Sequence, residues 1–211
     1  MKLADMTVTA FTDTVASDAP APGGGSVAAL AGSIGAALTA MVACLTQGRK
    51  KYADHATFAA RAEEKGNELK LRLMDVMDRD TEAFNLVSAA FAMPRTTEGE
   101  KAERSAAIQA GFKACTKTPM EMMELMAEAV ALAHSLLEEG FNDTAASDLG
   151  VAFLTLQAGI RGAWLNVLIN VGSIKDETFA REYRERGEAL LARTLPLADD
   201  GYARLLAMIR G

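Results

Sequence analysis

The fold is decided by an uncharged stretch from residue 23 to residue 48, which reads GGGSVAALAGSIGAALTAMVACLTQG. Small residues recur at every fourth position within it: Ala28, Gly32, Ala36, Ala40 and Cys44. Larger apolar residues occupy another face of the same predicted helix: Val27, Leu30, Ile34, Leu38, Met41 and Leu45. A helix that is apolar nearly all round is typical of a buried position. We therefore expect it at the centre of a helical bundle and also in a dimer interface.

The same stretch is long enough to span a lipid bilayer. However, it is rich in Ala, Gly, Ser and Thr rather than in Leu, Ile and Phe, the residues that favour membrane insertion most strongly. We therefore expect a buried helix of a bundle, and no membrane partner.

The composition of the whole chain favours an all-helical protein. Half of the 211 residues are apolar but only 6% are aromatic, so most of the apolar residues are helix formers. The formal charge of −6 argues against nucleic acid or an anionic membrane as a partner, because either would need a basic face. Two distant cysteines and two histidines indicate no metal site. With no secretory apolar core near the first residue, we expect a reducing, cytoplasmic location.

Helix-breaking residues divide the chain into roughly seven helices, which we assign to a single domain, residues 1–211. A short helix is expected over residues 8–16. Ser26 is the predicted N-cap of the next helix, because its hydroxyl can accept from the first free backbone N–H groups. A long helix over residues 54–92 should end before Pro94, whose ring and missing N–H stop a helix.

The second half of the chain contains the remaining helix boundaries. Thr97 begins a capping box with a glutamate three positions later, which predicts a helix start. A proline at the first helical position predicts another start and a helix over residues 118–140. Further helices are expected over residues 147–171 and 176–194, and a short C-terminal helix should follow Pro196.

One carboxylate occupies the apolar seam of the long helix predicted over residues 54–92. The seam residues recur at spacings of four and three: Leu69, Leu73, Val76, Asp80, Ala83 and Val87. A desolvated Asp80 would have its pKa raised unless a cation or N–H donors compensate for the lost water. A raised pKa suits an acid/base catalyst. The structural alternative is an aspartate that pairs with an arginine or caps a neighbouring helix.

Two amides, Asn166 and Asn170, lie on one face of the helix predicted over residues 147–171. Buried amides need hydrogen-bond partners, which neighbouring helices or a bound heterocycle could provide. Ser147 and Asp148 open the same helix, where they serve either as caps or as ligand contacts.

A glycine-rich turn opens the first long helix. It consists of Gly23, Gly24, Gly25 and Ser26. Free N–H groups and the helix dipole at such a turn favour an anion, although a tight turn with a serine cap needs the same glycines. The turn lacks the lysine and the glycine spacing of nucleotide-binding loops. Lys50 and Lys51 follow the other end of this helix, where they either complement its dipole or bind an acidic ligand tail.

Five segments carry a family resemblance when taken together and in order. They are residues 21–30 (APGGGSVAAL), 45–52 (LTQGRKKY), 80–84 (DTEAF), 147–152 (SDLGVA) and 162–170 (GAWLNVLIN). The chain resembles the cyclodeaminase domain of formiminotransferase-cyclodeaminase and the stand-alone methenyltetrahydrofolate cyclohydrolases over nearly its whole length. One departure is GFND at residues 140–143, where relatives tend to carry a Gly-Asn-x-Asn turn.

The resemblance implies an all-helical domain that forms homodimers and acts on a tetrahydrofolate derivative as substrate, without a bound prosthetic group or metal. It also implies that Asp80 corresponds to the aspartate associated with cyclodeaminase activity, in agreement with its seam position. We predict that folate lies near the turn at residues 23–26, with its glutamate carboxylates held by backbone N–H groups or by Lys50 and Lys51. The remaining predicted contacts are Ser147, Asp148, Asn166 and Asn170.

Two reactions are consistent with this family. A cyclodeaminase closes 5-formiminotetrahydrofolate to 5,10-methenyltetrahydrofolate and expels ammonia, whereas a cyclohydrolase adds water to the methenyl carbon to give 10-formyltetrahydrofolate. By a narrow margin the residues at 162–170 favour the cyclodeaminase, and a separate formiminotransferase would then have to supply its substrate. A non-catalytic helical dimer that binds folate or scaffolds a partner is the alternative from another class.

Overall fold

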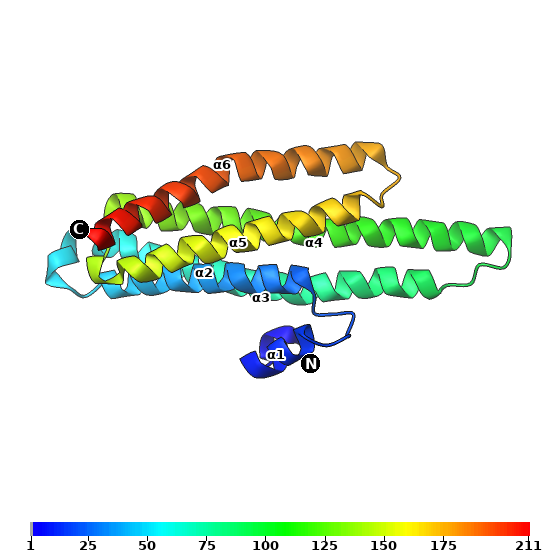
Figure 1. Ribbon diagram of the computed structural model, residues 1–211, viewed down its shortest axis with the longest axis horizontal. Helices are drawn as coiled ribbons and strands as arrows, with labels where there is room; N and C mark the ends of the chain where they lie inside the picture. The colour runs from blue at the N-terminus through cyan, green and yellow to red at the C-terminus, as the bar shows by residue number, and fades with distance from the viewer. Residues whose placement is uncertain (1) are drawn as a thin grey trace.

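Six α-helices and three short 3-10 helices make up this protein, whose computed structural model describes residues 2–211 (Figure 1). The α-helices are α1 (Val8–Val15), α2 (Gly24–Thr46), α3 (Ala56–Ala92), α4 (Glu98–Glu139), α5 (Ala146–Val171) and α6 (Glu177–Arg210). The 3-10 helices are η1 (Leu3–Asp5), η2 (Lys50–His55) and η3 (Asp143–Ala145). The described residues contain no strand, so the predicted all-helical class is confirmed.

Helix α2 lies within the bundle and packs most extensively against α3 and α5. Its small residues make this possible, since Ala28, Ala36 and Ala40 are all buried. On α3, a Cβ atom added to Gly66 would lie 2.9 Å from the Cβ atom of Ala40, so only glycine permits this approach of the two backbones. The prediction of a central helix is confirmed, although Cys44, the last residue of the small-residue stripe, is exposed.

The larger apolar residues of α2 are only partly covered. Several large apolar residues of α5, which packs beside α2, are also partly exposed, and we call these residues of the two helices together the α2/α5 face. It consists of Val27, Ile34, Met41, Leu45, Val151, Leu154, Leu165, Leu168 and Ile169. Individual exposures reach 66% for Leu165 and 72% for Ile169, and several exposed large apolar residues on two adjacent helices favour an interaction surface.

Two segments are long and apolar enough to cross a membrane by length and hydropathy alone. They are α2, with a mean hydropathy of 2.0 in its most apolar window, and Asp143–Val171, with 1.3. Within the bundle, 56% of the first window and 39% of the second are buried. The burial of α2 is that of a core helix.

Helices α3 and α4 extend past the start of α2 as an antiparallel pair, which Figure 1 shows in green. We call this part, residues 81–92 of α3 and 98–112 of α4, the overhang. Phe84 and Phe91 lie here on the side of α3 that faces α2 farther back, and they are 40% and 50% exposed because α2 does not reach them.

Two predicted helix boundaries are wrong, and both involve proline. The chain does not break at residue 118, because Pro119 lies inside the continuous helix α4. A proline in a helix leaves the carbonyl four residues earlier without its N–H donor. Here Asn170 donates to that carbonyl, on Cys115, over 2.7 Å. Pro196 likewise lies inside α6, so the predicted separate C-terminal helix is the last part of α6.

The cap predictions gave mixed results. The predicted capping box at Thr97 is present, and the helix predicted to start at residue 176 has Asp176 as its N-cap, which accepts from the N–H of Phe179. Gly23 rather than Ser26 is the N-cap of α2, and Ser26 is buried in the first turn. Helix α5 has no side-chain cap from Ser147 because it continues directly from η3, whose own cap is Asn142.

Candidate active site around Asp80

Asp80 lies on α3 at the level where α2 begins. Its Oδ1 atom accepts a hydrogen bond from the hydroxyl of Thr118, on α4, over 2.9 Å. Its Oδ2 atom occupies the space that a side chain on Gly25 would need, 2.3 Å from the position of that Cβ atom. The carboxyl group is therefore held between α2 and α4, with glycine required at the point of contact.

The surroundings of Asp80 favour its neutral form. Burial raises the pKa of the carboxyl above its ordinary value, and the hydrogen bond from Thr118 lowers it by less. No lysine, arginine or histidine within residues 2–211 pairs with Asp80. The structural alternative of a buried aspartate paired with an arginine therefore does not apply to the described chain.

A second titratable group beside Asp80 is the thiol of Cys115, on α4. Burial and, secondly, the charge of Asp80 raise the pKa of this thiol to about 11. A thiol with this pKa stays protonated at neutral pH and is a poor nucleophile. The proton chemistry at this point of the bundle therefore belongs to the carboxyl group.

Asn170 approaches the same region from α5. Its Nδ2 atom donates to the carbonyl of Cys115 over 2.7 Å and to that of Asn166 over 2.8 Å. Both acceptors are carbonyl oxygens, so the amide nitrogen must face them and the oxygen must point away. Pro119 frees the Cys115 carbonyl and thereby ties α4 to α5 one turn from Thr118.

Asn166 has the same arrangement one turn earlier on α5. Its Nδ2 atom donates to the carbonyl of Gly162 over 2.9 Å and lies 3.7 Å from where a Cβ atom of Gly24 would be. The Oδ1 atoms of Asn166 and Asn170 accept no hydrogen bond within residues 2–211. Both acceptors are therefore available to the N–H groups of a ligand.

The start of α2 adds hydrogen-bond donors beside Asp80. The first intrahelical bond runs from the N–H of Val27 to the carbonyl of Gly23. The N–H groups of the three residues between them have no backbone partner among the described residues, as at any helix start. The predicted turn at residues 23–26 thus lies beside Asp80 and close to Asn166.

The remaining predicted residues lie at the opposite end of α2. Lys50 and Lys51 belong to η2, and α2 alone separates them from its glycine turn by roughly 35 Å at the usual helical rise. Lys51 forms an ion pair of 2.5 Å with Asp143. Ser147 is exposed and Asp148 half-buried at the start of α5, again at this far end. Within one chain, the structure does not bring these four residues to Asp80.

Sequence reasoning missed Thr118 and Cys115 as parts of this site. Both lie where the sequence predicts a break between two helices, so it does not show that their side chains lie on one side of a single helix. The signal was present in the spacing, because Cys115, Thr118 and Pro119 fall on one side of a continuous helix.

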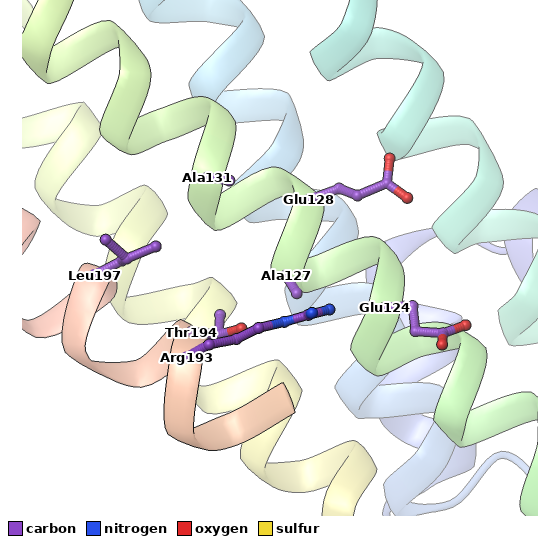
Figure 2. A pocket seen from close by; sticks show the side chains of 7 residues that line it. All are labelled: Glu124, Ala127, Glu128, Ala131, Arg193, Thr194 and Leu197. Carbon is purple, nitrogen blue, oxygen red and sulfur yellow. The ribbon is translucent and has the colours of Figure 1, made fainter. Parts of the chain in front are cut away.

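None of the predicted residues lines the groove of about 470 Å³ between α4 and α6 (Figure 2). Its lining includes Glu124, Glu128 and Arg193. Figure 2 shows the Arg193 side chain extending from α6 toward α4. No cluster of three potential metal ligands occurs within residues 2–211. The residues predicted to carry the chemistry therefore lie around Asp80 and not in this groove.

A family model described as formiminotransferase-cyclodeaminase matches residues 7–189. The chain belongs to the formiminotransferase-cyclodeaminase family. The match includes every residue described above around Asp80. The resemblance seen in the sequence is thus confirmed, and the chain is placed among folate one-carbon enzymes of the cyclodeaminase and cyclohydrolase type.

Members of this family with different reactions are similar to the chain. It is 41% identical over 186 residues to a methenyltetrahydrofolate cyclohydrolase from Methylorubrum extorquens, covering 88% of this chain and 89% of that protein. It is 33% identical to a formimidoyltransferase-cyclodeaminase from Rattus norvegicus, covering 90% of this chain but only 35% of the rat protein.

A solved family structure has the same fold. The crystal structure of formiminotetrahydrofolate cyclodeaminase from Thermotoga maritima superposes with a TM-score of 0.84 at 31% identity, covering 100% of this chain and 98% of that one. The chain thus spans nearly all of the Thermotoga protein and about a third of the rat protein.

Proposed function

We propose that this protein is a methenyltetrahydrofolate cyclohydrolase in which Asp80 carries the proton. The observation that carries the proposal is the setting of Asp80, a half-buried carboxyl group with one neutral donor and no cation among residues 2–211. Such a group has a pKa drawn toward neutrality and can both take and return a proton without a metal.

The charge of the substrate suits this setting. The reacting carbon of 5,10-methenyltetrahydrofolate lies in a cationic N–C–N unit. An ionised Asp80 would stabilise that cation, and the cation would in turn favour the ionised carboxylate. The absence of a protein cation beside Asp80 within the described chain thus leaves the carboxylate free for the substrate.

The proposed reaction has two proton transfers at Asp80. As a water oxygen bonds to the methenyl carbon, the carboxylate takes a proton from that water, which gives a neutral tetrahedral adduct. The protonated Asp80 then donates to N5 while the bond between the carbon and N5 breaks. The hydroxyl of the resulting cation loses its proton to solvent, which leaves 10-formyltetrahydrofolate and an ionised Asp80.

The groups around Asp80 would position the substrate. Asn166 and Asn170 each have a free acceptor oxygen, and a reduced pterin has an amino group and ring N–H groups to donate. The free N–H groups at the start of α2 provide donors on the other side. Of the folate contacts predicted from the sequence, these are the ones that one chain can provide near Asp80.

The cyclohydrolase is proposed ahead of the cyclodeaminase, which the sequence alone favoured, because the relative with 41% identity over nearly its full length is named a cyclohydrolase. The cyclodeaminase is the second candidate, since the structural neighbour of the same size is named for that reaction. Both reactions pass through a tetrahedral carbon between N5 and N10, so the same carboxyl group serves either one.

We also propose a cytoplasmic homodimer that buries the α2/α5 face. Its exposed leucine and isoleucine side chains would be covered by the same face of a second copy, as a two-fold axis requires. If the two copies of α2 run antiparallel, Lys50 and Lys51 of one copy would approach the glycine turn of the other. Their predicted role in folate binding thus depends on the dimer. Sedimentation at micromolar concentration tests it, and a monomer would contradict it.

The reaction is tested by incubating the protein separately with 5,10-methenyl- and 5-formiminotetrahydrofolate while following methenyl absorbance and ammonia. We expect loss of methenyl absorbance with the first substrate. A gain of absorbance with ammonia release from the second would establish the cyclodeaminase instead. Binding of folate without either reaction would establish the non-catalytic alternative.

A further inference from the structure

The groove of about 470 Å³ between α4 and α6, which we call the α4/α6 groove, contains a buried hydroxyl without a partner. Thr194, on α6, lines this groove and is only 2% exposed. Its hydroxyl forms no hydrogen bond within residues 2–211, whereas the other buried threonines each donate one: Thr39, Thr46, Thr116 and Thr118. Because buried polar groups are nearly always paired, an unpaired hydroxyl at the wall of a groove favours a ligand that reaches it.

The preceding residue, Arg193, is a second group of the α6 wall that lacks a partner. It is exposed and forms no ion pair within the described chain. Figure 2 shows its side chain extending from α6 toward α4. A guanidinium presents a planar fork of N–H groups that matches the two oxygens of a carboxylate. Arg193 and Thr194 together can therefore hold a carboxylate group.

The opposite wall of the α4/α6 groove is acidic. Glu124 and Glu128 lie one turn apart on α4. Glu124 pairs with Arg186, and Glu128 pairs with Lys65 over 3.1 Å. A carboxylate has lone pairs for about four donors, so both acids can accept a further N–H group from a ligand. Their charge would repel a simple anion at Arg193 but would attract an ammonium group.

The rest of the lining is apolar. It consists of Ala127 and Ala131 on α4 and Leu197 on α6 (Figure 2). The Leu197 side chain is 37% exposed, so an aliphatic group in the groove would remove apolar surface from water. The small side chains of the two alanines leave room for such a group.

We propose that the α4/α6 groove binds a free α-amino acid with an aliphatic side chain. The carboxylate would lie against Arg193 and Thr194, the ammonium group against the acids of α4, and the side chain against Leu197. Three features of the groove thus match the three groups that an α-carbon carries. None of these residues belongs to the site around Asp80, so this binding site is separate from the proposed reaction.

The test uses L-leucine as the probe, with binding measured by saturation-transfer NMR in the absence of folate. Two analogues each lack one charged group: 4-methylpentanoate has no ammonium group, and 3-methylbutylamine has no carboxylate. A hydrogen bond to a charged group is worth roughly tenfold in affinity or more. Each analogue should therefore bind the wild-type protein about tenfold more weakly than L-leucine.

Substitutions on α6 identify the groove as the binding site. Arg193→Gln should weaken L-leucine binding about tenfold and leave 3-methylbutylamine binding unchanged, because only the first ligand has a carboxylate. Thr194→Val should weaken L-leucine binding about fivefold, and Thr194→Ser should restore it. Arg210→Gln, which makes the same change in charge at the end of α6, is the matched control and should bind as the wild type does. Equal melting temperatures show that the variants are folded.

Three results would overturn the proposal. The first is no binding of L-leucine to the wild-type protein at millimolar concentration, and the second is an affinity that Arg193→Gln leaves unchanged. The third is binding of 4-methylpentanoate or inorganic phosphate as tightly as L-leucine, which would show a simple anion site. Because no folate is present, these results do not depend on whether the proposed function at Asp80 holds.

Discussion

An aspartate lies near each end of α2, but the two aspartates have different hydrogen-bond partners and opposite pKa shifts. At the far end, Asp143 accepts hydrogen bonds from the ammonium of Lys51 over 2.5 Å and from the hydroxyl of Tyr52 over 2.7 Å. These hydrogen bonds hold the pKa of Asp143 below its ordinary value. At the near end, the hydroxyl of Thr118 is the one hydrogen-bond donor to Asp80 within the described chain, and burial raises the pKa of Asp80. Two aspartates are thus shifted in opposite directions.

The buried polar groups of the far end are also paired with one another. Asn142 donates from its backbone to the hydroxyl of Thr46 over 2.9 Å and from its side chain to the carbonyl of Leu45 over 3.1 Å. Its own side-chain oxygen accepts from Thr144. The segment at 140–143 therefore closes the end of α2. Full pairing indicates a structural role, whereas free acceptors at the near end indicate binding.

The largest effect is expected from Asp80→Asn, which keeps the shape of the side chain but removes the titratable proton. Turnover should fall by roughly a hundredfold or more, the usual scale for losing a general acid or base. The corresponding limb of the pH profile should disappear. Near wild-type turnover would place the proton carrier elsewhere.

The same variant should be more stable than the wild type at neutral pH. A carboxyl whose folded pKa is raised binds more protons in the folded state, so its contribution to stability falls as pH rises from the unfolded to the folded pKa. Asp80→Asn should therefore raise the melting temperature at pH 7 and have little effect near pH 3. Asp143→Asn should do the reverse at pH 7, because its pKa is lowered. If both variants changed the melting temperature at pH 7 in the same direction, the opposite pKa shifts of the two aspartates would be contradicted.

The next effect is expected from Gly25→Ala, with Gly23→Ala as its matched control. A methyl group at Gly25 would lie 2.3 Å from Asp80 Oδ2 and must displace the carboxylate, whereas nothing lies within 4 Å of a methyl group at Gly23. We expect the first variant to lose roughly tenfold or more in kcat, since a displacement of about 1 Å can cost more than that. The second should be close to wild type, and similar losses in both would mean that the turn itself matters rather than Asp80.

At the far end, Asn142→Ala should reduce stability without changing the chemistry. The change removes the hydrogen bond that the buried Asn142 side chain donates to the Leu45 carbonyl, and an unsatisfied buried group typically costs about 1–3 kcal/mol, whereas the exposed Thr144 hydroxyl can bond water instead. Denaturant unfolding measures the loss, and the pH profile of kcat in the folded protein should not move. A shifted profile would make the far end part of the active site.

The smallest effect is expected from Thr118→Val, which keeps the shape but removes the donor. Because this hydrogen bond lowers the pKa of Asp80, its loss should move the Asp80 limb of the pH profile to higher pH. Thr118→Ser should restore the wild-type position. A lower pKa, or no rescue by serine, would show that Thr118 acts only through packing.

Much of this arrangement could be predicted from local patterns in the sequence. The small-residue stripe of α2 and the seam position of Asp80 depend on helical periodicity, which a single sequence displays. The continuity of α4 does not, because Pro119 is accommodated by Asn170, 51 positions later, and only tertiary packing reveals that partner. Because the sequence divides α4 at this point, it also does not show that Thr118 and Cys115 lie on one helix. The positive charge of Lys50 and Lys51 suggests that they act with the glycine turn, but the length of α2 keeps them far from that turn within one chain.

The central claim is that Asp80 is a proton carrier because its carboxyl titrates above the ordinary range. It is tested most directly by a 13C NMR titration of the aspartate carboxyl carbons, with Asp80 and Asp143 assigned from their Asn variants. The account predicts a pKa for Asp80 above the ordinary value of about 3.9 and a pKa for Asp143 below it. A pKa for Asp80 at or below that of Asp143 would contradict it.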